Sequence, residues 1–164
     1  MKELYIKQKI LSINEKFTVK DQQENDVYYV EGSFLKIPKS FSVLNAAGSE
    51  VALITKKVFS FLPKFHVEVN GQEVLTIKKE LSFFKARYSI DAAGIEVQGN
   101  WWDMEFEVSQ YGEVVGKVNK EWFKWGDSYK VQVLNEEMET IIIAIVVAID
   151  CVKADQAATS SATT

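Results

Sequence analysis

The stretch IIIAIVVAI, residues 141–149, is the longest uninterrupted apolar run of the chain and has no polar face. A helix that is apolar on every side has to be buried on every side. Residues 135–139 (NEEME) supply a polar N-cap and an acidic first turn, and neither glycine nor proline interrupts residues 138–153. We therefore predict a buried C-terminal helix. A strand is the alternative, because isoleucine and valine dominate the run. The predicted helix core consists of Ile141, Ile142, Ile145, Val146 and Ile149.

Short segments rich in valine, isoleucine, tyrosine and phenylalanine precede this helix, and turn residues separate them. Residues 65–69 alternate between apolar and polar side chains, which is typical of a half-buried strand. The pair Asn70-Gly71 is the strongest hairpin signal, because both residues tolerate positive φ. The predicted strands are residues 4–10, 16–20, 27–31, 40–44, 51–55, 64–69, 74–78, 86–90, 95–98, 105–109, 114–119 and 129–134.

These elements predict an all-β fold with one buried helix. A single sheet has to cover its inner face, and closing it around a helix hides both the sheet edges and the helix. We expect a closed antiparallel barrel of about twelve strands around the C-terminal helix, because the strand-like segments follow one another at short intervals. The 164 residues suit one domain. We place that domain at residues 1–154 and interpret residues 155–164 as a disordered tail.

Internal similarity indicates that the sheet arose by duplication of a hairpin unit. Residues 30–34 (VEGSF) resemble residues 97–101 (VQGNW), and further matches follow at the same offset of about 65 residues. A shorter unit recurs at residues 50–57, 73–79 and 113–120. Each copy is followed by an aromatic turn and another strand, and the spacing is too irregular for a solenoid or a propeller.

Composition removes several classes of function. The net charge is −4, whereas nucleic-acid-binding domains are usually basic, so we expect no nucleic-acid partner. Cys151 is the one cysteine, and His66 is the one histidine, so zinc sites built from several of these residues are excluded and no cofactor is predicted. The lack of a disulfide and of a signal peptide indicates the cytoplasm. The apolar run is too short to span a membrane, which needs about 18 residues.

The three aromatic turns carry lysines and form the candidate binding site. If they are equivalent, we expect them at one end of the barrel, where they would meet a lipid headgroup or a small anionic ligand. The alternative is that the rings plug the barrel mouth while the lysines lie on its rim. The candidate ligand or membrane contacts are Lys56, Lys57, Phe59, Phe61, Lys79, Phe83, Phe84, Lys85, Lys120, Trp122, Lys124 and Trp125.

Other reactive side chains have simpler interpretations. His66, Glu105 and Glu107 occupy polar positions of alternating strands and are expected on the outer face, so no catalytic residue is predicted. Asp150 is interpreted as an acid near the helix end that meets backbone N–H groups or a lysine at the barrel mouth; the alternative is a functional acid inside the barrel. Cys151 is expected to be a buried, inert thiol.

Several segments together resemble one known family. They are residues 17–19 (FTV), 29–32 (YVEG), 50–57, 88–90 (YSI), 129–133 (YKVQV) and 145–150 (IVVAID). This combination is similar to the bacterial branch of the LURP-one-related proteins, within the tubby C-terminal-like superfamily that also includes the phospholipid scramblases. The resemblance implies a twelve-stranded barrel around a C-terminal helix. Tubby domains bind phosphoinositide headgroups through basic residues, but none of those residues is matched here by motif.

We therefore expect a non-enzymatic binding or scaffold domain, cytoplasmic and peripheral to the membrane if its ligand is an anionic lipid. One alternative is a protein-interaction module that displays Trp101, Trp102, Trp122 and Trp125. The other is a hydrolase or transferase that uses carboxylates at a barrel mouth.

Overall fold

The computed structural model describes residues 1–7, 17–33, 38–57, 62–80, 87–92, 94–123 and 126–162. In these ranges, twelve strands are followed by a C-terminal helix. The strands are β1 (Lys2–Lys7), β2 (Phe17–Asp21), β3 (Asp26–Ser33), β4 (Ser40–Asn45), β5 (Glu50–Lys57), β6 (Lys64–Val69), β7 (Gln72–Glu80), β8 (Arg87–Asp91), β9 (Ile95–Asn100), β10 (Glu105–Gln110), β11 (Glu113–Phe123) and β12 (Gly126–Val133). The helices are the short 3-10 turns η1 (Trp101–Asp103) and η2 (Glu136–Met138), and α1 (Glu139–Ala162).

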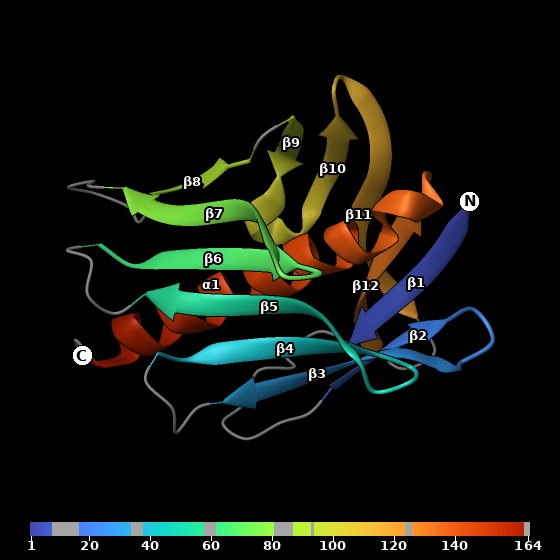
Figure 1. The fold of residues 1–164 in the computed structure, drawn as a ribbon, viewed down its shortest axis with the longest axis horizontal. Helices are drawn as coiled ribbons and strands as arrows, with labels where there is room; N and C mark the ends of the chain where they lie inside the picture. Colours follow the sequence, from blue (N-terminus) through green and yellow to red (C-terminus); the bar gives the residue numbers. More distant parts are fainter. Residues whose placement is uncertain are drawn as a thin grey trace.

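All twelve strands belong to one antiparallel sheet in the order β8-β7-β6-β5-β4-β3-β2-β1-β12-β11-β10-β9. Apart from β8 and β9, strands that are neighbours in the chain are neighbours in the sheet, and the pairing of β1 with β12 joins its two halves. The sheet curls around α1, and β8 and β9 are the two ends of its order (Figure 1). The predicted twelve-stranded barrel is confirmed. It is nearly closed: β8 and β9, which end the sheet, are not hydrogen-bonded to each other in the described part of the chain, and we call this gap the seam.

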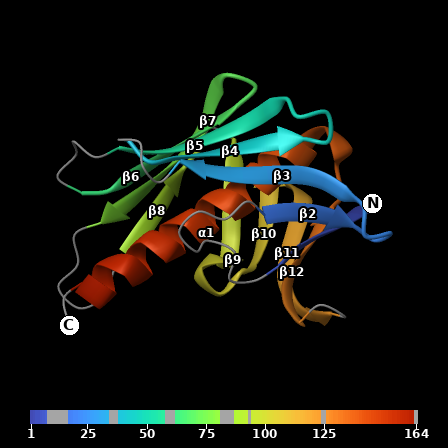
Figure 2. The ribbon, with the colours of Figure 1, turned by 90° about the horizontal axis from the view of Figure 1, so that it is seen from below.

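The helix occupies the concave side of the curled sheet (Figure 2). Each residue from Ile142 to Ile149 is at most 1 % exposed, so the prediction of a helix buried on every face is confirmed. Ile141 is only partly buried and packs against the same core. The strands contribute their alternate residues to this core, for example Phe65 and Val67 of β6.

The helix is longer than the sequence predicts. It continues to Ala162, so residues 155–162 are helical where a disordered tail is expected, and residues 163–164 lie outside the described part. At the start of this extension, Asp155 and Gln156 form polar contacts with lysines of the barrel wall. Such contacts join residues far apart in the sequence and leave no local signal.

The segments that are similar in sequence also correspond in strand register. Gly32 of β3 lies opposite Phe41 of β4, and Gly99 of β9 lies opposite Phe106 of β10. A register shift also interrupts each of four hairpins shortly before its turn, directly after Val19, Val43, Val67 and Val108. At the turn between β6 and β7, Asn70 and Gly71 have φ of 50° and 78°, as that hairpin signal requires.

The antiparallel order gives the barrel two distinct ends. The odd-numbered strands begin at the end where α1 begins, which we call the entry end. They finish at the end where the C-terminal part of α1 lies, which we call the exit end. Lys2 of β1 marks the entry end through its ion pair with Glu139, and Lys56 of β5 marks the exit end through its ion pair with Asp155. The two ends carry different side chains, and this difference defines the candidate site.

Candidate functional site

The strands that lead into the three predicted aromatic turns all finish at the exit end. β5 ends at Lys57, β7 at Glu80 and β11 at Phe123. Several residues of the predicted site lie outside the described part of the chain, namely Phe59, Phe61, Phe83, Phe84, Lys85, Lys124 and Trp125. Trp122 is described by its backbone alone, in β11. The described candidates are therefore the four lysines Lys56, Lys57, Lys79 and Lys120.

The pleat of the sheet divides these lysines between its two faces. Lys56 lies opposite the buried Phe65 and therefore faces the inside of the barrel. Lys57, the next residue, is exposed on the outer face. Lys79 follows the inward-facing Ile77 by two residues, and Lys120 lies opposite the buried Tyr129, so both belong to the inner face. The described lysines of the three predicted turns therefore fall into two sets, one on each face of the sheet.

The inner lysines of β5 and β7 contact the C-terminal part of α1. The Nζ of Lys56 lies 2.5 Å from Oδ1 of Asp155, and the two side chains are 23 % and 14 % exposed. The Nζ of Lys79 donates a hydrogen bond of 3.3 Å to Oε1 of Gln156. A partly buried ion pair is screened less by water than an exposed one, so this contact fixes the position of the helix end. Sequence reasoning missed both helix residues because it placed them in the tail.

A second polar cluster lies one turn earlier on the helix. Burial raises the pKa of Asp150 to about 6, while the positive charge of Lys153 and a hydrogen bond from Tyr129 act in the opposite direction. The Nζ of Lys153 lies 5.8 Å from the centroid of the Tyr129 ring. Burial also lowers the pKa of Lys153, and the nearby charge of Lys120 adds to this effect. Asp150 is therefore held by Tyr129 of the wall and by a lysine of its own helix.

The outer face of the same end carries a row of lysines on three adjacent strands. Lys57 of β5 lies directly opposite Lys64 of β6, and Lys64 lies directly opposite Lys78 of β7. We call these three residues the outer lysine row. Lys78 forms an ion pair of 3.0 Å with Asp91 of β8. Like charges directly opposite each other in a sheet are unfavourable. The row therefore costs stability in the absence of a bound anion.

Charge is segregated between the two ends, although the chain as a whole is acidic. The described lysines at the exit end include Lys7, Lys39, Lys56, Lys57, Lys64, Lys78, Lys79 and Lys120, against the acids Glu80, Asp91, Asp103, Glu105, Glu121 and Asp155, of which Asp91 is paired with Lys78. The described acids at the entry end include Asp21, Glu24, Asp26, Glu50, Glu73, Glu96, Glu113, Glu136, Glu137 and Glu139, against the lysines Lys2 and Lys20. The molecule is therefore strongly dipolar along the barrel, a property that its net charge of −4 conceals.

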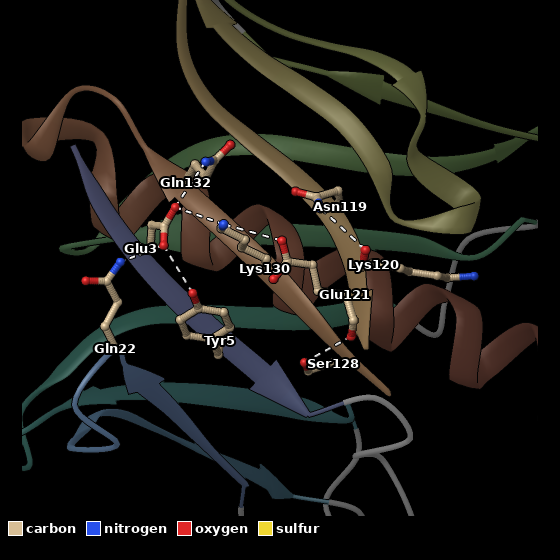
Figure 3. Close-up of polar contacts among 9 residues, drawn as sticks. All are labelled: Glu3, Tyr5, Gln22, Asn119, Lys120, Glu121, Ser128, Lys130 and Gln132. Atoms are coloured by element: carbon tan, nitrogen blue, oxygen red, sulfur yellow. Dashed lines mark hydrogen bonds and ion pairs between the residues drawn. The ribbon is translucent and has the colours of Figure 1, made fainter. Parts of the chain in front are cut away.

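The side wall formed by β1, β12 and β11 carries a separate polar network that sequence reasoning did not single out (Figure 3). The Nζ of Lys130 lies 2.9 Å from Glu3 and 3.3 Å from Glu121. Gln22, Gln132 and Tyr5 also donate hydrogen bonds to Glu3. The hydrogen bond from Lys130 is the main reason why the pKa of Glu3 falls to about 2. The network covers the outward-facing ring of Tyr5 and joins the first strand to the last.

The remaining candidates lie on the outer wall, as alternation predicts. The ring Nδ1 of His66 lies 3.1 Å from the carboxylate of Glu73. Glu107 is paired with Lys117 at 2.6 Å. Glu105 and Glu107 line an open depression of about 510 Å³ together with Gln98, Asn119 and Gln132, whose side chains are polar amides. This surface offers carboxylates and amides, but it lies away from the aromatic segments.

In the ranges that the structure describes, no three or more histidine, cysteine, aspartate or glutamate side chains come together as a metal site would require. Nor does any helix in these ranges have the length and apolar character needed to cross a membrane. Cys151 is buried, and burial raises the pKa of its thiol, which is the expected state of an unreactive core cysteine.

Comparison with known proteins identifies relatives across almost the whole chain. Residues 2–150 match the LURP-one-related family. The chain is 32 % identical over 152 residues to the uncharacterized protein YxjI of Bacillus subtilis (strain 168), an alignment that covers 93 % of this chain and 94 % of that protein. It is also similar to the X-ray structure of the protein AT5G01750 from Arabidopsis thaliana, with a TM-score of 0.57, 13 % identity and coverage of 91 % of each chain. At that identity the second likeness concerns the fold alone.

Proposed function

This chain belongs to the LURP-one-related family, and we propose that it is a non-enzymatic binding domain whose exit end contacts the negatively charged headgroups of a lipid surface. The observation that carries the proposal is the segregation of charge between the two ends of the barrel. An anionic surface attracts the exit end and repels the entry end, so it orients the molecule. Each lysine near such a surface contributes about 1 kcal/mol to binding.

The outer lysine row supports the same interpretation. Lys57 and Lys64 lie directly opposite each other on the adjacent strands β5 and β6, so their positive charges repel. The ion pair of Lys78 with Asp91 does not remove this repulsion. A negatively charged group placed over the row would relieve the repulsion between the lysines. The arrangement therefore gains more from an anion than the same lysines would gain if they were dispersed.

The sequence of the connecting segments adds an apolar component. Residues 58–61, 81–86 and 124–125 contain phenylalanine and tryptophan, and in the sequence they follow β5, β7 and β11, whose described ends lie at the exit end. Aromatic side chains are favoured at the boundary between lipid headgroups and acyl chains. Lysines and aromatics at one end are the combination that peripheral membrane proteins use, since neither component alone anchors a protein firmly.

Co-sedimentation with vesicles tests the proposal. We expect the protein to bind vesicles that contain phosphatidylserine but not pure phosphatidylcholine vesicles, and to bind less at about 0.5 M than at about 0.1 M salt, because salt screens the attraction. The double variant Lys57→Gln/Lys64→Gln should lose most of this binding. The matched control is Lys20→Gln/Lys117→Gln, which removes the same charge from the entry end and the side wall. Replacing Trp122 and Trp125 by alanine tests the apolar component.

Two results would contradict the proposal. One is that wild-type protein binds neither kind of vesicle. The other is that the two double variants lose binding equally, which would show that total charge rather than the exit end decides. Thermal melting of both variants separates a loss of binding from a loss of folding.

The two alternatives predicted from the sequence draw on different residues. For a protein-interaction module, the described tryptophans Trp101 and Trp102 are half-buried, pack edge to face at 5.7 Å and contact the hydrophobic core. For an enzyme, the carboxylates of Glu105 and Glu107 lie on the outer wall, and Glu107 is occupied by Lys117. Loss of vesicle binding on replacing Lys57 and Lys64, but not on replacing Trp102 or Glu105, would favour the lipid surface over both.

A further inference from the structure

The inner lysines of the exit end are engaged by the protein itself. Asp155 presents a carboxylate to Lys56 of β5, and Gln156, the next residue, presents an amide oxygen to Lys79 of β7. Both lysines belong to the inner face, so they lie beneath the helix end and not on the outer surface. Two cations on the barrel wall are thus matched by one anion and one neutral group from α1.

No large apolar side chain anchors residues 153–157 of the helix. Val152 is fully buried, but residues 153–156 are only half-buried, and Ala157 is exposed. The sequence that follows, AATSSATT, contains no large apolar side chain, and its threonines and serines have low helix propensity. A helix end without a packed face depends on its polar contacts and opens at a low free-energy cost. Residues 153–162 form what we call the latch segment.

We propose that the latch segment is displaceable, and that Lys56 and Lys79 form an inner site for a phosphate group which Asp155 and Gln156 occupy when the site has no external ligand. The proposal rests on the proposed function, because the same end of the barrel receives the anion. A phosphate group carries close to two negative charges and three acceptor oxygens. Lys56 and Lys79 contact adjacent residues of the helix, so we expect one phosphate group in their place to accept hydrogen bonds from both, whereas the carboxylate of Asp155 contacts only Lys56.

Whether Asp155 or a phosphate group occupies the site depends on how strongly each one binds Lys56 and Lys79. Asp155 is covalently attached, so its effective concentration at Lys56 is high and a weak monovalent anion does not displace it. A phosphate group competes because it also gains the charge of Lys79, whose described contact is with the neutral amide of Gln156. Release of the latch segment would follow from occupation of the site, since its polar contacts would then be lost.

Hydrogen exchange of the latch segment, measured with and without inorganic pyrophosphate, tests the proposal directly. We expect pyrophosphate to accelerate exchange in residues 153–162 of the wild-type protein. Asp155→Asn should show fast exchange without ligand and should bind pyrophosphate about fivefold more tightly in calorimetry, because the internal competitor has lost its charge. Adding Lys56→Gln to this variant should abolish the gain. The matched control is Glu137→Gln, an exposed acid near the start of the helix.

The outcomes distinguish the inner phosphate site from the lipid-binding surface. The latch is overturned if Asp155→Asn binds pyrophosphate no more tightly than Glu137→Gln, or if pyrophosphate leaves the exchange of residues 153–162 unchanged. Vesicle binding that depends on Lys57 and Lys64, together with either of those results, overturns the latch and leaves the proposed function standing. Conversely, release of the latch by pyrophosphate without any binding to vesicles supports the inner site for a soluble phosphate and overturns the lipid surface.

Discussion

Gly116 of β11 and Ile142 of α1 lie so close that a β-carbon added to Gly116 would be 2.7 Å from Cδ1 of Ile142. Two further atoms of Ile142 would lie 3.2 and 3.3 Å from it. Both residues are buried, and the glycine is required for space, since its φ is not among the positive values. This contact sets how closely the first turns of the helix approach the wall.

Enlarging Gly116 should therefore destabilise the barrel. We expect Gly116→Val to lower the free energy of unfolding by about 2–3 kcal/mol, because the side chain overpacks a filled core. Gly116→Ala should cost about 1 kcal/mol, since the end of Ile142 can shift slightly. Urea denaturation measures both values. Lys117→Ala, on the outer face of the same strand, should stay within about 0.5 kcal/mol of the wild type, and an equal loss in all three variants would contradict the packing argument.

Asp150 predicts a pH-dependent stability. Burial raises its pKa from 3.8 to about 6, so between these values the folded state binds more protons than the unfolded state. Stability therefore falls as pH rises through this range and stays lower above pH 6. We expect Asp150→Asn to stabilise the protein by up to about 3 kcal/mol at pH 7.5 and to have almost no effect below pH 4. Urea midpoints at the two pH values measure this, and a stabilisation of equal size at both would contradict it.

Glu3 predicts the opposite behaviour at low pH. Its pKa is depressed from 4.5 to about 2, chiefly by the hydrogen bond from Lys130, so its stabilising effect is complete above pH 4.5 and disappears as pH falls through about 2. We expect Glu3→Gln to destabilise the protein by about 1–2 kcal/mol at pH 7, after allowance for screening by water, and not at pH 2. Denaturation of Glu107→Gln, which breaks an exposed pair with Lys117, is the control. A similar loss of stability in both variants would show that the network around Glu3 stabilises the protein no more than an exposed ion pair does.

The outer lysine row predicts a conflict between stability and binding. Lys64→Glu places a carboxylate directly opposite Lys57 and Lys78, and we expect it to raise the free energy of unfolding by about 0.5–1 kcal/mol. The same substitution should weaken binding to phosphatidylserine vesicles. The control Lys117→Glu makes the same charge change but lies opposite Glu107, so it should lower stability and leave vesicle binding nearly intact. If Lys64→Glu is more stable than the wild type but still binds vesicles, the outer lysine row does not contribute to vesicle binding.

The architecture could be predicted because short stretches of the sequence determine its helix and its hairpins. The run at residues 141–149 requires burial on all sides, and Asn70-Gly71 requires a tight turn, so helix and hairpins follow from short stretches. The alternation in residues 65–69 also fixes which side of β6 faces the core. The seam at β8 and β9 has no such local signal, because it depends on how the whole sheet curls.

The site could be predicted only in part, because its contacts join distant residues. Lys56 and Asp155 are separated by 99 positions, and nothing in the sequence near Asp155 shows that its partner lies on β5. The division between Lys56 and Lys57 was available from alternation along β5, since Ala52 and Ile54 face inward and Lys56 continues their series. The segregation of charge likewise appears only once the strands are placed end to end in the barrel.

In the proposed function, the exit end binds an anionic surface and the entry end does not. An environment-sensitive dye attached at Glu80→Cys, where β7 finishes, reports on the exit end, and the same dye at Glu113→Cys, where β11 begins, reports on the entry end. Both positions are exposed and both substitutions remove one negative charge, whereas the native Cys151 is buried. On addition of phosphatidylserine vesicles, we predict a blue shift and stronger emission from the dye at residue 80 and an unchanged spectrum from the dye at residue 113. A shift at residue 113 alone, or no shift at either position, would contradict the account.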